Sequence, residues 1–325
     1  MKKILTWILL FILLASSALG YWVNRPQALP SKTFEFSINA GSSLKSVANQ
    51  LAQAQFLQQE TLFVVLARVL GKADKVKVGE YALTHPVSML ELLDIISKGQ
   101  VQQSQISVIE GWSFKQFRAA VDAHADLKHA TQELTAPQIL QAIGATETHP
   151  EGLFFPDTYF FAKGSSDVQI YKRAYQTMQQ HLSVAWATRE ADLPLHTPYE
   201  ALTLASIVEK ETGTPRDRAM IAGVFVNRLR IGMLLQTDPT VIYGMGEKFD
   251  GNIRRNDLTR DTLYNTYTRS GLTPTPIALP GAASLQAALH PAKTDALYFV
   301  ARGDGSSKFS SSLDAHNRAV NQYQK

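Results

Sequence analysis

Apolar and polar positions follow one another along this chain in patterns typical of short strands and amphipathic helices. Period-two alternation and strand-like composition predict strands at 33–38, 79–83, 297–301 and 308–310. Helical spacing and start signals predict helices at 44–53, 60–70, 88–97, 167–190, 197–213 and 216–232, with a turn and helix at 280–291. Residues 122–150 also look helical, and the aromatic stretch 151–161 indicates a packed, structured loop. The expected fold class is therefore α+β.

The N-terminus has the pattern of a membrane anchor. An apolar run from Ile4 to Val23 follows two lysines and has about the length needed to cross a bilayer. Because the positive residues precede the run, the rest of the chain is expected to face outward. We expect residues 1–23 to be the anchor and residues 24–32, with two prolines, to be a linker. A cleaved signal peptide is the alternative, since Ala15–Gly20 resembles a signal peptidase site.

The composition excludes several classes of function. The 325 residues include no cysteine, which rules out disulfides, thiolate metal sites and a cysteine nucleophile. A net charge of +4 without a dense basic stripe argues against nucleic acid as a partner. The sequence has no phosphate-binding loop, no dinucleotide fingerprint and no HExxH motif, so we expect neither a cofactor nor a catalytic metal. The chemistry is left to carboxylates, amides and tyrosines, which points to sugar bonds.

The stretch 197–213 predicts a buried helix that ends in two carboxylates. Thr197 and Glu200 form a capping-box pattern, and the positions that follow are apolar almost all round. Glu209 and Glu211 then occupy the last turn. A carboxylate at the end of a buried helix is an unusual feature, and it makes this stretch the centre of the functional hypothesis.

The two glutamates project from nearly opposite faces, because residues advance by about 100° per position. Glu209 projects over Ser206 and other small side chains that leave room for a ligand, whereas bulkier side chains lie below Glu211. Partial burial and the negative end of the helix dipole disfavour an ionised Glu209, as a general acid requires. A structural salt bridge with Arg216 or Arg218 is the alternative role.

Several long segments are characteristic of one family. They are EGLFFPDTYFF at Glu151–Phe161, LASIVEKET at Leu204–Thr212, VFVNRLRIGMLLQTDPTVIYGMG at Val224–Gly246, YNTY at Tyr264–Tyr267, PGAASLQAALHPAKT at Pro280–Thr294, YFVA at Tyr298–Ala301 and the pair His316–Asn317. In these segments, which extend over nearly the whole chain, it resembles the YceG-like family, the endolytic murein transglycosylases. The resemblance implies a small LysM-like βααβ subdomain at 33–103 and a larger mixed α+β catalytic domain at 104–325.

The resemblance also implies a reaction, a catalytic residue and a location. The essential glutamate of the family is the first Glu of the SIVEKE motif, which is Glu209 here. The implied reaction cleaves the β-1,4 bond between MurNAc and GlcNAc within nascent peptidoglycan strands, leaves 1,6-anhydroMurNAc ends and terminates strand elongation. The protein would be a single-pass inner-membrane protein with its catalytic domain in the periplasm. Peptidoglycan synthases, the penicillin-binding proteins, are candidate partners.

Polar residues near the central helix are candidates for holding the sugar or its N-acetyl group: Asn227, Gln236, Tyr243, Asn265 and Tyr267. Two alternative functions stay open. A muramidase hydrolase would pair Glu209 with a second carboxylate, for which Asp238 is the candidate, although its side chain is expected to cap the turn before Pro239. A non-enzymatic peptidoglycan-binding scaffold would rest on the LysM-like subdomain alone.

Overall fold

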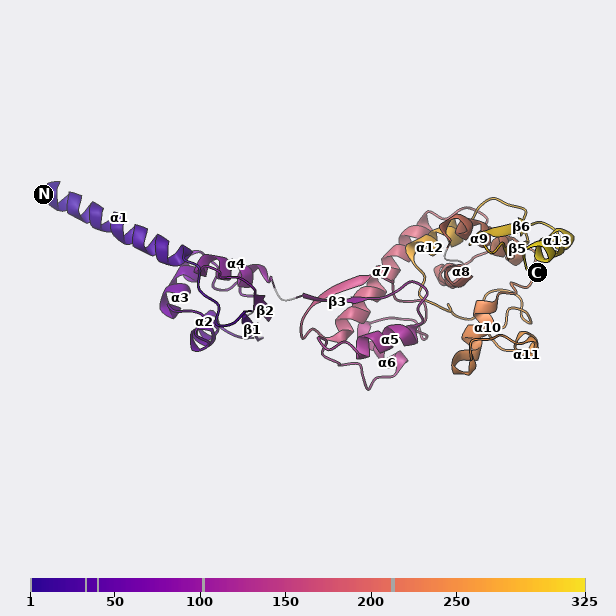
Figure 1. Cartoon of the computed structure of the whole chain (residues 1–325), viewed down its shortest axis with the longest axis horizontal. Helices are drawn as coiled ribbons and strands as arrows, with labels where there is room; N and C mark the ends of the chain where they lie inside the picture. Colours follow the sequence, from indigo (N-terminus) through magenta and orange to yellow (C-terminus); the bar gives the residue numbers. More distant parts are fainter. Residues whose placement is uncertain (1, 33, 40, 101–102, 212–213, 325) are drawn as a thin grey trace. The chain divides into compact units, whose positions relative to one another are not determined.

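The computed structural model describes residues 2–32, 34–39, 41–100, 103–211 and 214–324 (Figure 1). The chain divides into two compact units. The first consists of residues 1–104 and 160–165, and the second of residues 105–159 and 166–325. Helices and short two-stranded sheets are mixed in the structure, which confirms the α+β fold class.

The first unit contains the predicted strand–helix–helix–strand order, followed by a further helix. Its elements are α1 (Lys2–Asn24), β1 (Phe34–Ile38), α2 (Leu44–Gln53), α3 (Glu60–Val69), β2 (Gly79–Leu83) and α4 (Met89–Lys98). The strands β1 and β2 pair antiparallel, with Phe34 opposite Leu83. Ser88 caps the start of α4, and Gly99 ends it in a left-handed conformation, as the local sequence signals require. The predicted strand residue Thr33 lies outside the described residues.

Helix α1 covers the apolar run at the N-terminus and contains 23 residues. In the part of the chain that the structure describes, no helix combines the length and the apolar character that crossing a membrane requires. The membrane anchor at residues 1–23 therefore stays a prediction.

The second unit is mainly helical. Its helices are α5 (Phe114–Asp122), α6 (Ala136–Ile143), α7 (Asp167–Ala187), α8 (Pro198–Glu211), α9 (Pro215–Arg230), α10 (Asp238–Met245), α11 (Arg255–Thr259), α12 (Ala282–Leu289) and α13 (Leu313–Tyr323), with a 3₁₀ turn at Gly246–Lys248. The strands β5 (Tyr298–Ala301) and β6 (Ser307–Ser310) form the predicted antiparallel hairpin. The strands β3 (Gln103–Ser107) and β4 (Thr158–Ala162) form another two-stranded sheet, and the boundary of the two units falls within both strands.

Helix α8 lies at the centre of the core of the second unit, as its apolar sequence predicts. Every residue from Ala201 to Val208 is buried, and α8 packs against α7, α9 and α12. At its start the Glu200 N–H donates to the Thr197 hydroxyl at 3.2 Å. The Glu200 carboxylate accepts from the His196 N–H at 2.6 Å, one residue before the position that a standard capping box uses. A start fixed in this way sets which side chains the last turn of α8 presents on each face.

Two of the expected elements differ from the structure. Only α6 is helical within 122–150, because the N–H groups of Ala130 and Thr131 donate to the buried Asp167 carboxylate instead of to a helical ladder. The aromatic stretch at 151–161, expected to be a loop, ends in strand β4. Helices α10, α11 and α13 were not expected from the sequence pattern.

Candidate functional site

The carboxylate of Glu209 is enclosed by the chain itself, with a side chain that is 7% exposed. Its Oε2 accepts a hydrogen bond from the Gly281 N–H at 3.0 Å. The Arg218 guanidinium lies 4.0 Å from Oε1, as the structural alternative for this residue predicts. On the neighbouring residue, Lys210, the ammonium group donates to the Gly111 carbonyl at 3.2 Å. These contacts join the last turn of α8 to the N-terminus of α12, to α9 and to the turn at Gly111.

The small side chains beside Glu209 lie against the backbone of the chain. Ser206 is fully buried, and its hydroxyl accepts a hydrogen bond from the Ile277 N–H at 3.0 Å. Ile277, Ala278 and Leu279 are themselves buried. The segment 277–281 therefore fills the space that the sequence pattern assigned to substrate, because small side chains on a buried helix allow a backbone to approach closely.

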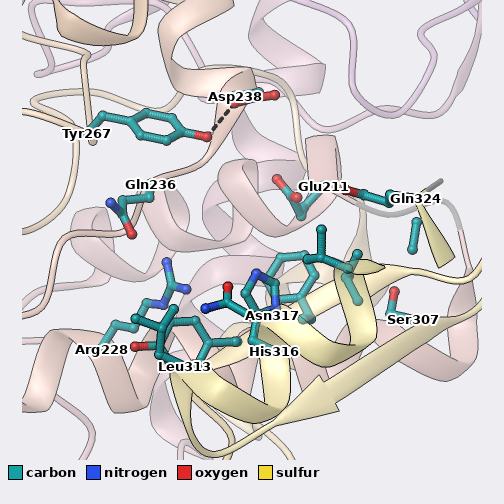
Figure 2. Close-up of a pocket in the computed structure, with 15 residues that line it drawn as sticks. Glu211, Arg228, Gln236, Asp238, Tyr267, Ser307, Leu313, His316, Asn317 and Gln324 are labelled. Carbon is teal, nitrogen blue, oxygen red and sulfur yellow. Dashed lines mark hydrogen bonds between the residues drawn. The ribbon is translucent and has the colours of Figure 1, made fainter. Parts of the chain in front are cut away.

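Glu211, two residues further along α8, lines a cavity of about 570 Å³ (Figure 2). The other walls of the cavity come from α9, the start of α10, the hairpin β5–β6 and α13. Figure 2 shows Glu211 between Asp238 on one side and His316 and Asn317 of α13 on the other. The cavity brings together a carboxyl group, amides and aromatic rings, which is a typical lining for a site that binds sugar.

Burial raises the pKa of the Glu211 carboxyl group above its ordinary value. The Thr237 hydroxyl opposes this by donating a hydrogen bond to Oε2 at 2.6 Å. The negative charge of Asp238 raises the pKa further, and the positive charge of Arg228 lowers it. A carboxyl group whose pKa is raised beside an accessible cavity can donate a proton near neutral pH.

Asp238 and Tyr267 both line the cavity and form a short hydrogen bond with each other. The Tyr267 hydroxyl donates to Asp238 Oδ1 at 2.5 Å (Figure 2). Burial, and then this hydrogen bond, raise the pKa of Tyr267. Asp238 is the first residue of α10, and this interaction replaces the turn cap expected before Pro239. The Asp238 carboxylate is thus hydrogen-bonded to Tyr267, which also lines the cavity.

The Arg228 guanidinium fixes the frame of the cavity. Its Nε donates to the Leu297 carbonyl at 2.7 Å and its Nη1 to the Leu235 carbonyl at 2.7 Å. These bonds join α9 to the residue before β5 and to the loop that carries Gln236. Gln236 has a φ of 48°, in the left-handed region that non-glycine residues rarely adopt. Strained conformations of this kind are frequent at functional sites.

The described residues that line the cavity include Gln236, Tyr267 and Asp238, but not Glu209 or the other three sugar-binding candidates. The Asn227 amide donates to the Thr294 and Ala296 carbonyls at 2.8 and 3.1 Å. The Asn265 amide donates to three backbone carbonyls, at 2.7, 3.0 and 3.2 Å. The Tyr243 hydroxyl donates to Glu151 Oε2 at 3.1 Å. In the structure these three side chains connect segments of the chain to one another.

Residues of the C-terminal helix α13 also line the cavity, which the sequence pattern does not predict. His316 and Asn317 line it, and the His316 ring stacks on Tyr298 with 5.2 Å between ring centroids. Burial, and then the charge of Arg228, lower the pKa of His316. In the sequence the His316–Asn317 pair stands out only through the family resemblance, because nothing local indicates that α13 packs against β5 and β6.

No group of side chains suited to holding a metal ion is found among the described residues. Fold and site together define a mixed α+β protein whose central helix presents one carboxylic acid to a polar cavity. The sequence profile of the YceG-like family matches residues 36–322, and the chain belongs to this family.

Similar proteins are found in several bacteria. The chain is 32% identical over 308 residues to a Bacillus subtilis (strain 168) protein named endolytic murein transglycosylase, a match that covers 90% of this chain and 85% of that protein. A Streptococcus pneumoniae (strain R6) protein of the same name is 26% identical, with 96% of this chain and 63% of that protein covered. The crystal structure of a yceG-like protein from Listeria monocytogenes is 28% identical, with a TM-score of 0.55 over 89% of this chain and 99% of that chain.

Proposed function

We propose that this chain is an endolytic murein transglycosylase that cleaves the β-1,4 bond between MurNAc and GlcNAc within peptidoglycan strands. Its relatives from Bacillus subtilis and Streptococcus pneumoniae carry that name. The observation that carries the proposal in the structure is the Glu211 carboxyl group, whose pKa is raised beside a polar cavity. Cleavage would leave 1,6-anhydroMurNAc ends and, on nascent strands, would terminate elongation.

A single carboxyl group is sufficient for this reaction. Protonated Glu211 gives its proton to the glycosidic oxygen as the bond to the anomeric carbon breaks. The Glu211 carboxylate then accepts the proton of the muramyl 6-hydroxyl, whose oxygen forms the new bond to the anomeric carbon. The nucleophile belongs to the substrate, so no water is consumed and no second carboxylate is required, in contrast to ordinary glycosidases. The Thr237 hydroxyl holds Oε2 and leaves Oε1 to exchange the proton.

The geometry supports Glu211 as the acid better than Glu209, which the family resemblance predicts. Glu211 lines the cavity, whereas Glu209 is held by Gly281 and Arg218 beneath a buried segment. Gln236 and Tyr267 line the same cavity as Glu211, so we assign to them the binding of the sugar. The names of the relatives favour neither a hydrolase nor a non-enzymatic scaffold.

The paired variants Glu211→Gln and Glu209→Gln test the assignment on purified glycan strands. A glutamine nearly preserves shape but has no acidic proton, so Glu211→Gln should lower turnover by at least about 10²–10⁴-fold. Glu209→Gln can still accept the Gly281 N–H and should keep most of the turnover. Thermal unfolding of both variants checks that the fold is intact. The opposite order of the two losses would return the catalytic role to Glu209.

We also propose that the N-terminal region holds the enzyme at the inner membrane, with the second unit in the periplasm near the peptidoglycan synthases. Supporting this, the run Ile4–Val23 is apolar, and Trp7, Leu13 and Leu14 on α1 are exposed. The strand–helix–helix–strand order of the first unit supports a LysM-like subdomain at 33–103.

A further inference from the structure

Helix α3 in the first unit has two apolar faces, and only one of them is buried. Phe63 and Ala67 point into the core and are fully buried. The second face consists of Leu62, Val65, Leu66, Val69 and Leu70, which recur at the spacing i, i+3, i+4, i+7 and i+8 of a continuous helical stripe. We refer to these five residues as the α3 stripe.

The α3 stripe becomes more exposed towards the end of the helix. Leu62 and Leu66 are partly buried and pack against the core of the unit. Val65, Val69 and Leu70 are 49%, 78% and 44% exposed. A scattered apolar side chain on a surface needs no explanation, but a stripe at helical spacing is typical of a surface that binds an apolar partner.

Basic residues lie in and directly after the exposed C-terminal end of the stripe in the sequence. The segment 68–78 contains Arg68, Lys72, Lys75 and Lys77 against one acid, Asp74. Lys72 forms an ion pair with Asp94 and is therefore engaged within the unit. Arg68, Lys75 and Lys77 are exposed. Apolar side chains next to an excess of positive charge suit the boundary of an anionic bilayer. Acyl chains and acidic headgroups are both within reach there.

We propose that the α3 stripe, with Arg68 and Lys75 beside it, binds the surface of an anionic lipid membrane. The first unit already carries the exposed apolar side chains of α1, so two apolar surfaces of one unit would contact the same bilayer. A weak contact at the α3 stripe is reinforced by an anchor on the same unit, because the anchor raises the local concentration of the stripe at the bilayer. The proposal is independent of glycan cleavage.

The test uses single-cysteine variants of the full chain, which has no cysteine of its own. A fluorophore sensitive to its surroundings is attached at Val69→Cys, and at Ser46→Cys on the exposed side of α2 as a control. Each protein is reconstituted with vesicles of phosphatidylcholine alone or mixed with phosphatidylglycerol, and a water-soluble quencher is added. We expect the Val69 label to be protected several-fold on the anionic vesicles only, and the Ser46 label to stay accessible on both.

A charge-reversed pair separates membrane binding from general electrostatic attraction. Arg68→Glu with Lys75→Glu should abolish protection of the Val69 label, while cleavage of soluble glycan stays unchanged. The matched control, Lys32→Glu with Lys98→Glu, alters the same net charge at residues outside the cavity that Arg68 lines and should leave protection intact. Equal quenching of the Val69 label with and without anionic vesicles would overturn the proposal. An equal loss of protection from the two charge-reversed pairs would also overturn it. If two copies of the Val69→Cys variant crosslink to each other without lipid, the stripe is instead a contact between copies of the chain.

Discussion

Glu151 is a buried carboxyl group that is not among the residues lining the cavity. It is 3% exposed, and it accepts hydrogen bonds from the Phe114 N–H at 2.8 Å and the Tyr243 hydroxyl at 3.1 Å. Burial raises its pKa from 4.5 to about 7, and the hydrogen bonds only partly oppose this. The protonated form is therefore favoured in the folded state, which links the stability of the second unit to pH.

This link predicts how the variant Glu151→Gln changes the pH dependence of unfolding. The stabilising contribution of protonated Glu151 is complete below pH 4.5 and is lost as the pH rises to about 7. Integrated over that interval, the loss is of the order of 3 kcal/mol. Urea unfolding at pH 5 and pH 8 should show a larger decrease in the free energy of unfolding for the natural chain than for the variant. Equal decreases would mean that Glu151 does not titrate in this range.

The sequence predicts that two glutamates end α8, but not which of them faces a cavity. Their positions on opposite faces follow from helix geometry alone. The surroundings of each face come from distant parts of the chain: Gly281 and Ile277 cover the side of Glu209, while β5 and α13 enclose the side of Glu211. Only tertiary contacts decide which carboxyl group lines the cavity, and residue spacing along α8 does not contain them.

At the scale of elements, α1 carries a prediction that N-terminal sequencing can check. Its apolar run is longer than the usual core of a signal peptide, so the segment should stay attached to the mature protein. Protein extracted from membranes should begin at or next to the first methionine. A mature protein that begins near Leu19 or Gly20 would identify the segment as a cleaved signal peptide and refute the anchor.

Elements with strong local patterns were predicted correctly, and those defined by distant contacts were not. Helices α2, α3, α4, α7 and α8 and the hairpin β5–β6 follow from apolar periodicity, caps and turn residues. The stretch 122–150 has polar helical periodicity, but a buried Asp167 holds part of it as a loop. Helix α10 begins at Asp238–Pro239, a pair that reads equally well as a turn in a polar loop.

At the scale of the whole molecule, the contacts that shape the cavity join segments far apart in sequence. The Asn227 amide donates to carbonyls 67 and 69 residues away. Arg228 reaches the Leu297 carbonyl, also 69 residues away. A sequence can indicate that such a buried polar group is satisfied. It cannot identify which distant group is the hydrogen-bond partner. Three of the five sugar-binding candidates, Asn227, Tyr243 and Asn265, have their partners within the chain.

The chemistry of the glycan ends tests the central claim most directly. The purified enzyme is incubated with glycan strands in water enriched in heavy oxygen, and the new ends are analysed by mass spectrometry. We predict anhydromuramyl ends that contain no solvent oxygen, because the muramyl 6-hydroxyl attacks the anomeric carbon. New ends that are heavier by one water molecule and carry the heavy isotope would contradict the transglycosylase and indicate hydrolysis. In that case Asp238, beside Glu211 in the same cavity, would be the second carboxylate to examine.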